Sequence, residues 1–356
     1  MTQAIINLSS CRHNLSVAKK TAAKSRCIAV IKANAYGHGM VKIAQALNDT
    51  DAFAVARISE AIELREAGIS IPIILLEGFS SKNELELIVK YKFDSVIHSE
   101  EQLKLLENFE SSLINIIIKI DTGMHRLGYM PEDVTEVYSR LQQCSCVDKN
   151  ITLMTHFSSA DDKHDDKTLK QIEVFYQSIE ELPESELSLS NSAGILGWPQ
   201  SHASWNRPGI MLYGVSPFIN SIANEHNLKP VMTLKSQLIS VKEIKKGEAI
   251  GYGGTYVCDK DMTVGIVAIG YGDGYPRHAK TGTPVLVNGK VSQLLGRVSM
   301  DMICVDLSEQ KNAKINDPVI LWGEGLAIED IADSAGTIAY ELLCAVTNRV
   351  EFNYID

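Results

Sequence analysis

The chain contains 356 residues, more than most single hydrophobic cores use, so we expect one large domain and a smaller one. Hydrophobic residues make up 45% of the chain and charged residues 22%, which is typical of an ordinary globular protein. The formal net charge is −10, and the sequence has no basic patch, which argues against nucleic acid as a partner because a phosphate backbone would be repelled.

No apolar run is long enough to cross a bilayer, and the opening MTQAIINLSS lacks the basic and apolar regions of a signal peptide. The seven cysteines are scattered, and the close pair Cys144 and Cys146 is not a C-x-x-C motif. This pattern is typical of reduced thiols and supports neither disulfides nor a zinc site. We therefore expect a cytoplasmic protein without membrane contact and without a metal site.

The first two-thirds of the chain alternates short apolar runs with amphipathic, helix-like segments. Several of these segments begin with a capping serine followed by glutamate, as at Ser59-Glu60 and Ser99-Glu100. Such alternation predicts an α/β fold, a closed (β/α)₈ barrel of the TIM type over residues 1–228. The eight apolar runs span 27–33, 52–57, 72–78, 93–98, 113–121, 151–157, 187–193 and 207–214.

An open, doubly wound sheet is the competing fold. Its dinucleotide-binding loop would place G-x-G-x-x-G directly after the first strand, where this chain instead has KANAYGHG at 32–39. The barrel is therefore the better prediction.

From residue 229 the pattern changes to short β-branched runs separated by Gly, Asn and Asp turns. Asn288-Gly289 between two such runs predicts a two-residue hairpin, and a short helical stretch lies near 328–346. Residues 229–356 are therefore assigned to a second, mostly-β domain.

Two further motifs are weaker signals. GYGDGY at 270–275 lies in the β half with no helix after it, so it does not predict nucleotide binding. The acidic segment 160–167, which includes His164, could hold a cation, but it is more typical of a solvated helix start.

Lys32 interrupts the apolar run CIAVIKA and lies where the first predicted strand ends. In a barrel, functional residues gather where strands end and the following loops begin. Burial lowers the pKa of an amine and makes it a competent nucleophile toward carbonyl groups. From this segment alone two interpretations stay open: a catalytic amine, or a lysine whose stem packs on the barrel while its head reaches water.

The surrounding segment VIKANAYGHG resembles the lysine motif of the alanine racemases, pyridoxal-phosphate enzymes built from a barrel and a β domain. Further segments similar to that family follow in the same order, so the resemblance covers nearly the whole chain. These segments are KIDTGMHRLG (119–128), THFSSAD (155–161), NSAG (191–194), RPGIMLYG (207–214), LKSQL (234–238), GYGGTY (251–256), IGYGDGYPR (269–277), GRVSMDM (296–302) and TIAYELLCAV (337–346).

The resemblance implies an isomerase that interconverts L-alanine and D-alanine and supplies D-alanine for peptidoglycan synthesis. It implies that Lys32 carries pyridoxal 5′-phosphate covalently and exchanges protons on one face of the substrate. Tyr252 of the other subunit would serve the opposite face, so a homodimer would share its active sites. Without the resemblance, Tyr252 reads as an aromatic residue in a turn, because a phenol with a pKa of about 10 is a poor base at neutral pH.

The same resemblance implies the groups that hold the cofactor. Arg207 would face the pyridine nitrogen and leave the ring unprotonated, because a guanidinium donates and does not deprotonate in this range. His156 would help to orient Arg207. Taken alone, Arg207 reads as a surface residue at a strand end, and His156 as a hydrogen-bonded core histidine. The positions that match the phosphate-binding residues are Tyr36, Ser192, Gly209, Ile210 and Tyr340.

Substrate contacts are implied at two places. Arg126 would contact the phenolic oxygen of the cofactor and the substrate carboxylate, a task that suits a guanidinium. Lys119 stands at a position that is often carbamylated in the family, and a carbamate there would hold Arg126 in place. Met300 would offer its backbone N–H to the substrate carboxylate, while Ser299 stands where relatives often have cysteine. A narrow corridor to the site, suited to alanine, would be lined by Tyr271, Arg277, Arg297, Asp161 and Ile338.

Three alternative functions stay open. A serine or broad-specificity racemase would share every catalytic residue and differ in the width of the corridor. A cofactor carrier or regulator would use the barrel without turnover, although the single-barrel relatives of that kind lack a β domain with GYGGTY. A cofactor-free aldolase would use Lys32 on a similar barrel and would be colourless.

Overall fold

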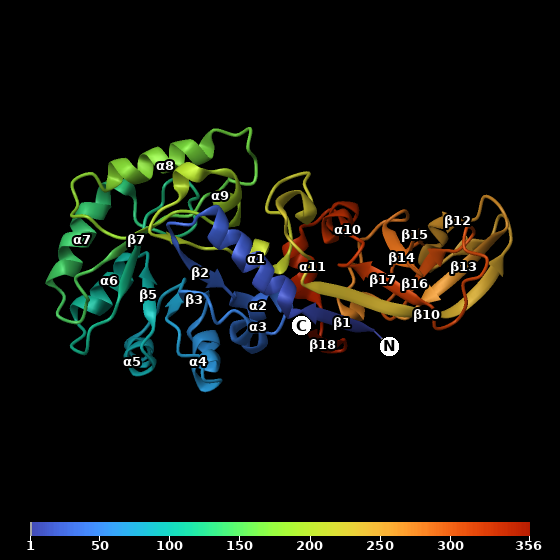
Figure 1. The fold of residues 1–356 in the computed structure, drawn as a ribbon, viewed down its shortest axis with the longest axis horizontal. Coiled ribbons are helices and arrows are strands. Elements are labelled where there is room, and N and C mark those ends of the chain that lie inside the picture. Colours follow the sequence, from blue (N-terminus) through green and yellow to red (C-terminus); the bar gives the residue numbers. More distant parts are fainter. Residues whose placement is uncertain (1) are drawn as a thin grey trace.

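Eight short parallel strands form a barrel in the N-terminal part of the computed structural model, which describes residues 2–356 (Figure 1). In pairing order the strands are β9 (Trp205–Asn206), β2 (Arg26–Val30), β3 (Ala52–Val55), β4 (Ile73–Leu75), β5 (Asp94–Ile97), β6 (Ile116–Lys119), β7 (Thr152–Met154) and β8 (Leu187–Ser188). Where β8 and β9 meet, Arg207 N donates to Ser190 O at 3.0 Å, and the barrel is nearly closed. The predicted barrel is confirmed.

Helices surround the barrel because each presents one apolar face to the strands. In α5, for example, Leu85 and Ile88 are buried while the flanking charged residues face solvent. The strands are packed on both sides, so every residue of β3 and β6 is buried. The helices are α1 (Leu8–Thr21), α2 (Lys32–Gly37), α3 (Met40–Ala46), α4 (Ile58–Glu66), α5 (Lys82–Tyr91), α6 (Glu100–Glu107), α7 (Val134–Gln143), α8 (Lys167–Ser178) and α9 (Ser192–Gly197), with 3₁₀ turns η1 (Pro131–Asp133), η2 (Pro199–Ser201), η3 (Ile210–Tyr213) and η4 (Ala223–His226).

Two of the predicted barrel strands differ from the structure. The run at 207–214 is not a strand: β9 ends at Asn206 and η3 follows, because Pro208 has no N–H to give to a strand ladder. The run at 27–33 ends as strand β2 at Val30, and Lys32 is the first residue of α2.

One of the two predicted helix caps is confirmed. Ser99 Oγ accepts from Gln102 N at 3.4 Å at the start of α6. The cap predicted at Ser59 is wrong, because α4 begins one residue earlier, at Ile58, and Ser59 lies inside it.

The C-terminal part forms a second sheet, and the predicted mostly-β region is confirmed. The Asn288-Gly289 hairpin is confirmed as well, with φ of +51° and +73° between two antiparallel strands. In pairing order the large sheet contains β13 (Met262–Val267), β16 (Ile303–Asp306), β15 (Lys290–Leu295), β14 (Pro284–Val287), β17 (Pro318–Trp322), β10 (Met232–Ile244), β1 (Gln3–Asn7) and β18 (Glu351–Ile355). The remaining elements are the small ribbon β11 (Ala249–Ile250) and β12 (Tyr256–Val257), the turns η5 (Tyr252–Gly254) and η6 (Tyr271–Asp273), and the helices α10 (Ile328–Ala335) and α11 (Ala339–Ala345).

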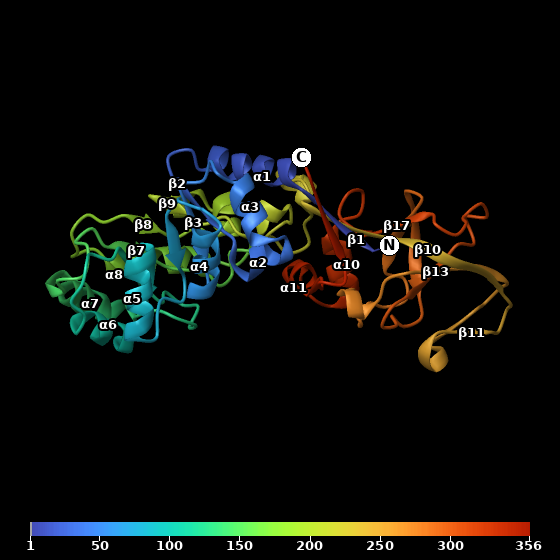
Figure 2. The same cartoon turned by 90° about the horizontal axis from the view of Figure 1, so that it is seen from below.

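The two ends of the chain lie side by side in this second sheet. Strand β1 pairs antiparallel with β10 and parallel with β18, so the first strand of the chain is not part of the barrel. Helices α10 and α11 lie between the barrel and the C-terminal sheet (Figure 2). The division of the chain between residues 228 and 229 stays a prediction. Among residues 2–356, no helix is long and apolar enough to span a membrane.

Candidate active site

Lys32 opens a left-handed turn at the carboxyl end of β2. The four residues that follow it, 33–36, have φ between +51° and +53°. A left-handed conformation costs roughly 1–2 kcal/mol per non-glycine residue, so four in succession persist only where the surroundings hold them. His38 supports the end of this turn, because its Nδ1 lies 3.0 Å from the carbonyl oxygens of Ala35 and Tyr36.

Four cationic side chains gather around this turn: Lys32, Lys119, Arg126 and Arg207. Burial lowers the pKa of Lys32, and the nearby charge of Arg126 lowers it further. Burial, followed by the charges of Arg126, Arg207 and Lys32, lowers the pKa of the buried Lys119 to about 8. In residues 2–356 no carboxylate forms an ion pair or hydrogen bond with any of the four side chains. A site with this much unpaired positive charge suits an anionic occupant.

Arg207 is fixed in the barrel by backbone carbonyls. Its Nη1 donates to Ser188 O at 2.8 Å, and its Nη2 donates to Thr155 O at 2.6 Å and Leu189 O at 3.1 Å. Burial lowers its pKa to about 10, so the guanidinium stays charged at neutral pH. Its Nε has no partner in the described chain and is available to a bound group.

His156 lies against this guanidinium as a neutral ring. Arg207 Nη2 is 3.4 Å from His156 Nδ1, and burial together with the Arg207 charge holds the histidine pKa well below its usual value. Because a guanidinium can only donate, Nδ1 accepts and the ring proton resides on Nε2. The structure therefore brings together Arg207 and His156, as the family resemblance predicted.

Three of the predicted phosphate-binding residues meet beside α9 and η3. Ser192 Oγ accepts from Gly209 N at 2.9 Å, and a Cβ on Gly209 would lie 2.9 Å from the Tyr36 hydroxyl. Glycine is therefore required where these residues converge. Ile210 opens η3 at the same place, and the start of a helix presents backbone N–H groups that suit a phosphate. Tyr340, from α11, lies with its ring centre 6.0 Å from that of Tyr36.

Arg126 lies in an exposed loop after β6. The carboxylate of Asp121 shapes this loop by accepting from Gly123 N at 3.0 Å and from His125 N at 2.9 Å. His125, with a φ of +54°, is a further left-handed residue directly before Arg126. Asp121 thus fixes the backbone of the loop that carries Arg126.

The other predicted site residues form a separate group in the C-terminal part. Tyr271 N donates to Ser299 O at 3.1 Å, and Gly272 N donates to Met300 O at 2.8 Å, so η6 is fastened to the segment that bears Met300. Arg297 lies beside the turn η5, because a Cβ on Gly253 would be 3.5 Å from its Nη1. Tyr252, the first residue of that turn, is 68% exposed.

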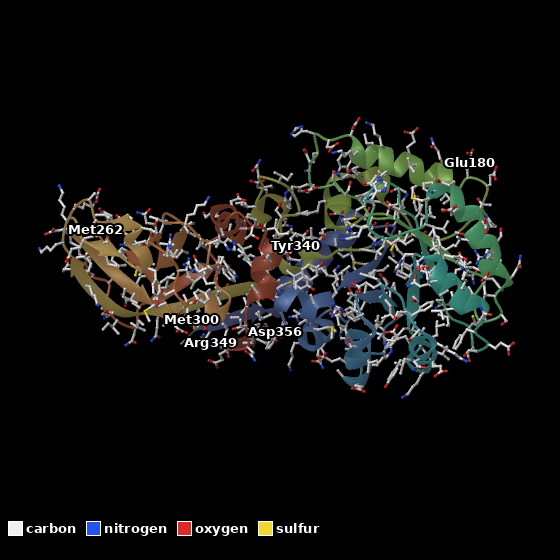
Figure 3. The ribbon with its side chains drawn as sticks, turned by 180° about the vertical axis from the view of Figure 1, so that it is seen from behind. Glu180, Met262, Met300, Tyr340, Arg349 and Asp356 are labelled. Carbon is white, nitrogen blue, oxygen red and sulfur yellow. The ribbon has the colours of Figure 1, made fainter. Side chains whose placement is uncertain are left out.

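This second group lies away from the barrel of its own chain. The ribbon of β11 and β12 lies at the end of the molecule opposite the barrel in both views (Figures 1 and 2). Met300 lies on the C-terminal domain, whereas Tyr340 lies where α11 approaches the barrel (Figure 3). The predicted catalytic pair, Lys32 and Tyr252, is therefore not brought together within one chain.

The corridor residues are divided between the same two groups. The negative charge of Asp161 contributes to the raised pKa of Tyr340, so these two residues lie near each other, and Ile338 is two residues before Tyr340. Arg277 follows η6 and is exposed, as is Arg297. A cavity of about 520 Å³ opens at the carboxyl ends of β3 to β5, and none of the predicted catalytic, cofactor-binding or corridor residues lines it.

We expect the protein to lose stability as the pH falls from about 6.5 to about 4. Burial lowers the pKa of His38 to about 4, and His156 is also held neutral. Below the pKa of an unfolded histidine, the unfolded chain binds protons that the folded chain excludes. The stability is therefore complete above about pH 6.5, and His38 alone accounts for a loss of about 3 kcal/mol by pH 4.

Urea unfolding at a series of pH values measures this effect. His38→Gln should flatten the dependence of the unfolding free energy on pH. His164→Gln, which alters an exposed histidine, should leave that dependence unchanged. Equal pH profiles for wild type and His38→Gln would contradict the prediction.

Comparison with known proteins covers both parts of the chain. Residues 6–217 match the family "Alanine racemase, N-terminal domain", and residues 231–354 match "Alanine racemase, C-terminal domain". The chain is 49% identical over 354 residues to the biosynthetic alanine racemase of Escherichia coli O6:H1, with 99% of this chain and 98% of that protein covered. It is 48% identical over 353 residues to the alanine racemase of Aeromonas hydrophila, with 99% of both covered.

Solved structures of alanine racemases are similar to this chain over its full length. The biosynthetic alanine racemase of Pseudomonas aeruginosa superposes with a TM-score of 0.97 at 43% identity, with 100% of this chain and 99% of that chain covered. The alanine racemase of Bartonella henselae with covalently bound pyridoxal phosphate superposes with a TM-score of 0.90 at 29% identity, with 99% of each chain covered. By both domain matches and by its full-length similarity, this chain belongs to the alanine racemase family.

Proposed function

We propose that this protein is a pyridoxal-phosphate-dependent isomerase that interconverts L-alanine and D-alanine and supplies D-alanine for peptidoglycan synthesis. The observation that carries the proposal is the amine of Lys32, half-buried at the end of β2 among Lys119, Arg126 and Arg207, with its pKa lowered. Membership of the family supports the same conclusion.

The residues around Lys32 fit the chemical groups of pyridoxal phosphate. An aldehyde requires an amine of lowered pKa, which Lys32 provides. A ring nitrogen requires one donor, for which Arg207 Nε is available, and a phenolic oxygen requires a cation, for which we assign Arg126. The phosphate requires N–H groups and hydroxyls, and we assign it to the following residues: Tyr36, Ser192, Gly209, Ile210 and Tyr340.

When bound, pyridoxal phosphate accepts the electron pair of the α-carbon, which makes an otherwise very weakly acidic α-proton removable. Lys32 Nζ takes or returns that proton on one face of the carbon. Tyr252 Oη of the partner subunit does the same on the opposite face. Racemisation follows, because a proton removed from one side is replaced from the other.

The remaining polar groups orient the substrate and restrain side reactions. We assign the substrate carboxylate to Arg126 and to the backbone N–H of Met300 of the partner subunit. Arg207, held by three carbonyls with His156 beside it, would donate to the ring nitrogen and leave it unprotonated, so that the ring would be a weaker electron acceptor. A carbamate on Lys119 would remove one like charge beside Arg126 and replace it with a partner.

A homodimer with shared active sites follows from this assignment. Tyr252 is 68% exposed and Met300 52% exposed. The ribbon of β11 and β12, which flanks Tyr252, lies at the end of the molecule opposite the barrel that carries Lys32 (Figures 1 and 2). Two further large apolar side chains, Met302 and Ile338, are also exposed, and a second copy of the chain could bury them. Each site would then combine the barrel of one subunit, residues 1–228, with the β domain of the other, residues 229–356.

We assign selectivity for alanine to the corridor residues named above, because a narrow corridor admits a methyl side chain and penalises larger ones. Ser299 acts only through the backbone segment it shares with Met300, and we expect it to change little. We place the protein in the cytoplasm, which its unpaired cysteines support.

The deciding experiment is racemisation of L-alanine by the purified protein with and without added pyridoxal phosphate, followed by circular dichroism. We expect rotation to disappear, and we expect the protein to be yellow. A carrier would bind the cofactor and leave the rotation unchanged, and a cofactor-free aldolase would be colourless. Comparable rates with L-lysine or L-arginine would remove the assignment to alanine, and a higher rate with L-serine would support the serine racemase instead.

A further inference from the structure

The carboxylate of Glu60 joins two parts of the barrel mouth. Glu60 lies in the first turn of α4, and its Oε2 accepts from Ala56 N at 2.9 Å and Arg57 N at 3.1 Å, directly after β3. Its Oε1 accepts from Ala33 N at 2.6 Å, directly after Lys32. One side chain therefore links the end of β3 to the residue that follows the amine.

Capping of α4 accounts for only one of these two oxygens. A glutamate in the first helical turn commonly accepts from the backbone N–H groups that precede the helix, and Oε2 alone does this here. Oε1 instead reaches the neighbouring β2–α2 connection. The link across the mouth is thus additional to the local function of Glu60.

Ala33 is the place where the left-handed turn begins. In residues 2–356 its N–H has no other hydrogen-bond partner. His38 holds the carbonyl groups at the far end of the turn, so Glu60 and His38 fasten the two ends. Hydrogen bonds to a charged carboxylate are short and about twice as strong as neutral ones, which suits a group that must oppose backbone strain.

We propose that Glu60 is a positioning residue for Lys32, which fixes the direction in which the lysine leaves β2 by holding Ala33 N–H against the end of β3. The inference rests on the proposed function, because it gives Lys32 its task. Without this link the turn can relax. The side chains of Lys32 and Tyr36 extend from its two ends, so the distance between Lys32 Nζ and the Tyr36 hydroxyl would no longer be fixed.

Glu60 also affects Lys32 through its negative charge. A variant of Glu77 separates this effect of charge from the effect of the hydrogen bond to Ala33 N. The negative charges of Glu77 and Glu60 both oppose the lowering of the Lys32 pKa. The side chain of Glu77 forms no hydrogen bond in the described chain. Glu77→Gln therefore removes a charge near Lys32 while leaving the turn attached. Glu63→Gln removes an exposed carboxylate of α4 that touches neither Lys32 nor the turn.

The experiment titrates full-length apoprotein with pyridoxal phosphate and records the visible absorbance and circular dichroism of the bound cofactor. In Glu60→Gln an amide NH₂ must face one of the N–H donors, so we expect about tenfold weaker binding. At saturating cofactor, well below the unfolding temperature, we also expect an altered dichroism band, which a loss of stability alone would not produce. Glu63→Gln should match wild type, and Glu77→Gln should keep the wild-type dichroism.

Each outcome decides between the alternatives. Binding and dichroism in Glu60→Gln equal to those of Glu63→Gln would overturn the positioning role. An equal loss of affinity in Glu77→Gln, with normal dichroism in both variants, would assign Glu60 to charge alone and also overturn it. If Glu60→Gln does not fold, Glu60→Asp takes its place, since it keeps the charge but is too short to reach both sites, and wild-type behaviour there would refute the proposal. Failure of wild-type protein to bind the cofactor would instead refute the proposed function.

Discussion

Replacement of Lys32 by alanine is expected to remove covalent attachment of the cofactor and to lower the rate of alanine racemisation by about 10⁴-fold or more. In the proposed mechanism this amine attaches the cofactor and is one of the two groups that exchange protons with the substrate. Lys119, Arg126 and Arg207 remain in the variant, so we still expect reversible binding of the phosphate-bearing cofactor. The measurements are the visible absorbance after exhaustive dialysis and the rate of loss of rotation from L-alanine and D-alanine.

A control tests whether any nearby lysine would have the same effect. Lys42 lies on the exposed side of α3 in the same part of the chain, and Lys42→Ala should keep both colour and rate. Persistent absorbance and turnover after dialysis of the Lys32 variant would refute the role assigned to Lys32. Restoration of slow turnover by an added primary amine would support it.

Tyr252→Phe is expected to keep the bound cofactor and its colour but to impair proton exchange far more from L-alanine than from D-alanine. We assign the phenol to one face of the substrate, so its removal should leave Lys32 to exchange protons on the other face. Incorporation of deuterium from heavy water into each enantiomer measures the two directions separately. Equal exchange in both directions at the wild-type rate would refute the assignment of two separate bases.

Mixing the two inactive variants tests whether the sites are shared. A mixed dimer of Lys32→Ala and Tyr252→Phe subunits contains one site with both groups intact and one site with neither. Random pairing therefore restores about a quarter of the wild-type activity. If both groups came from the same chain, the mixture would stay inactive.

The outline of the fold could be predicted from residue patterns because those patterns are local. Apolar runs alternating with amphipathic segments indicated the barrel. Asn288-Gly289 marked the hairpin between β14 and β15 of the second sheet, because a turn of two successive left-handed residues favours that pair. The run at 207–214 misled for a physical reason: its apolar side chains are buried in η3 as fully as they would be in a strand. The burial of apolar side chains alone does not distinguish a 3₁₀ turn from a strand.

The strand β1 was missed because its partners are distant in the chain. It lies between β10 and β18, and its neighbours, starting at Met232 and Glu351, are far from Gln3 in the sequence. Long-range pairing of this kind leaves no local signal beyond a short alternation of apolar residues.

The identity of the site residues could be predicted, but the backbone conformation and hydrogen bonds that position them could not. Lys32, His156 and Arg207 were recognised from motifs, and the structure places them around one mouth. The left-handed conformation of 33–36 has no sequence signal, because Ala33 and Ala35 favour a right-handed helix. Glu60 was noticed only as a helix-capping residue, since its contact with Ala33 depends on how β2 and β3 lie side by side.

The pairing of the last strand with the first has a consequence for synthesis of the protein. Tyr354, in β18, donates its hydroxyl to His38 O at 3.1 Å, so a residue translated long after the barrel braces the turn that begins at Lys32. The barrel can condense while the ribosome is still adding the β region, yet the turn that carries Lys32 lacks this brace until β18 has emerged. A nascent polypeptide stalled before β18 is made would therefore carry a complete barrel with an unbraced reaction centre.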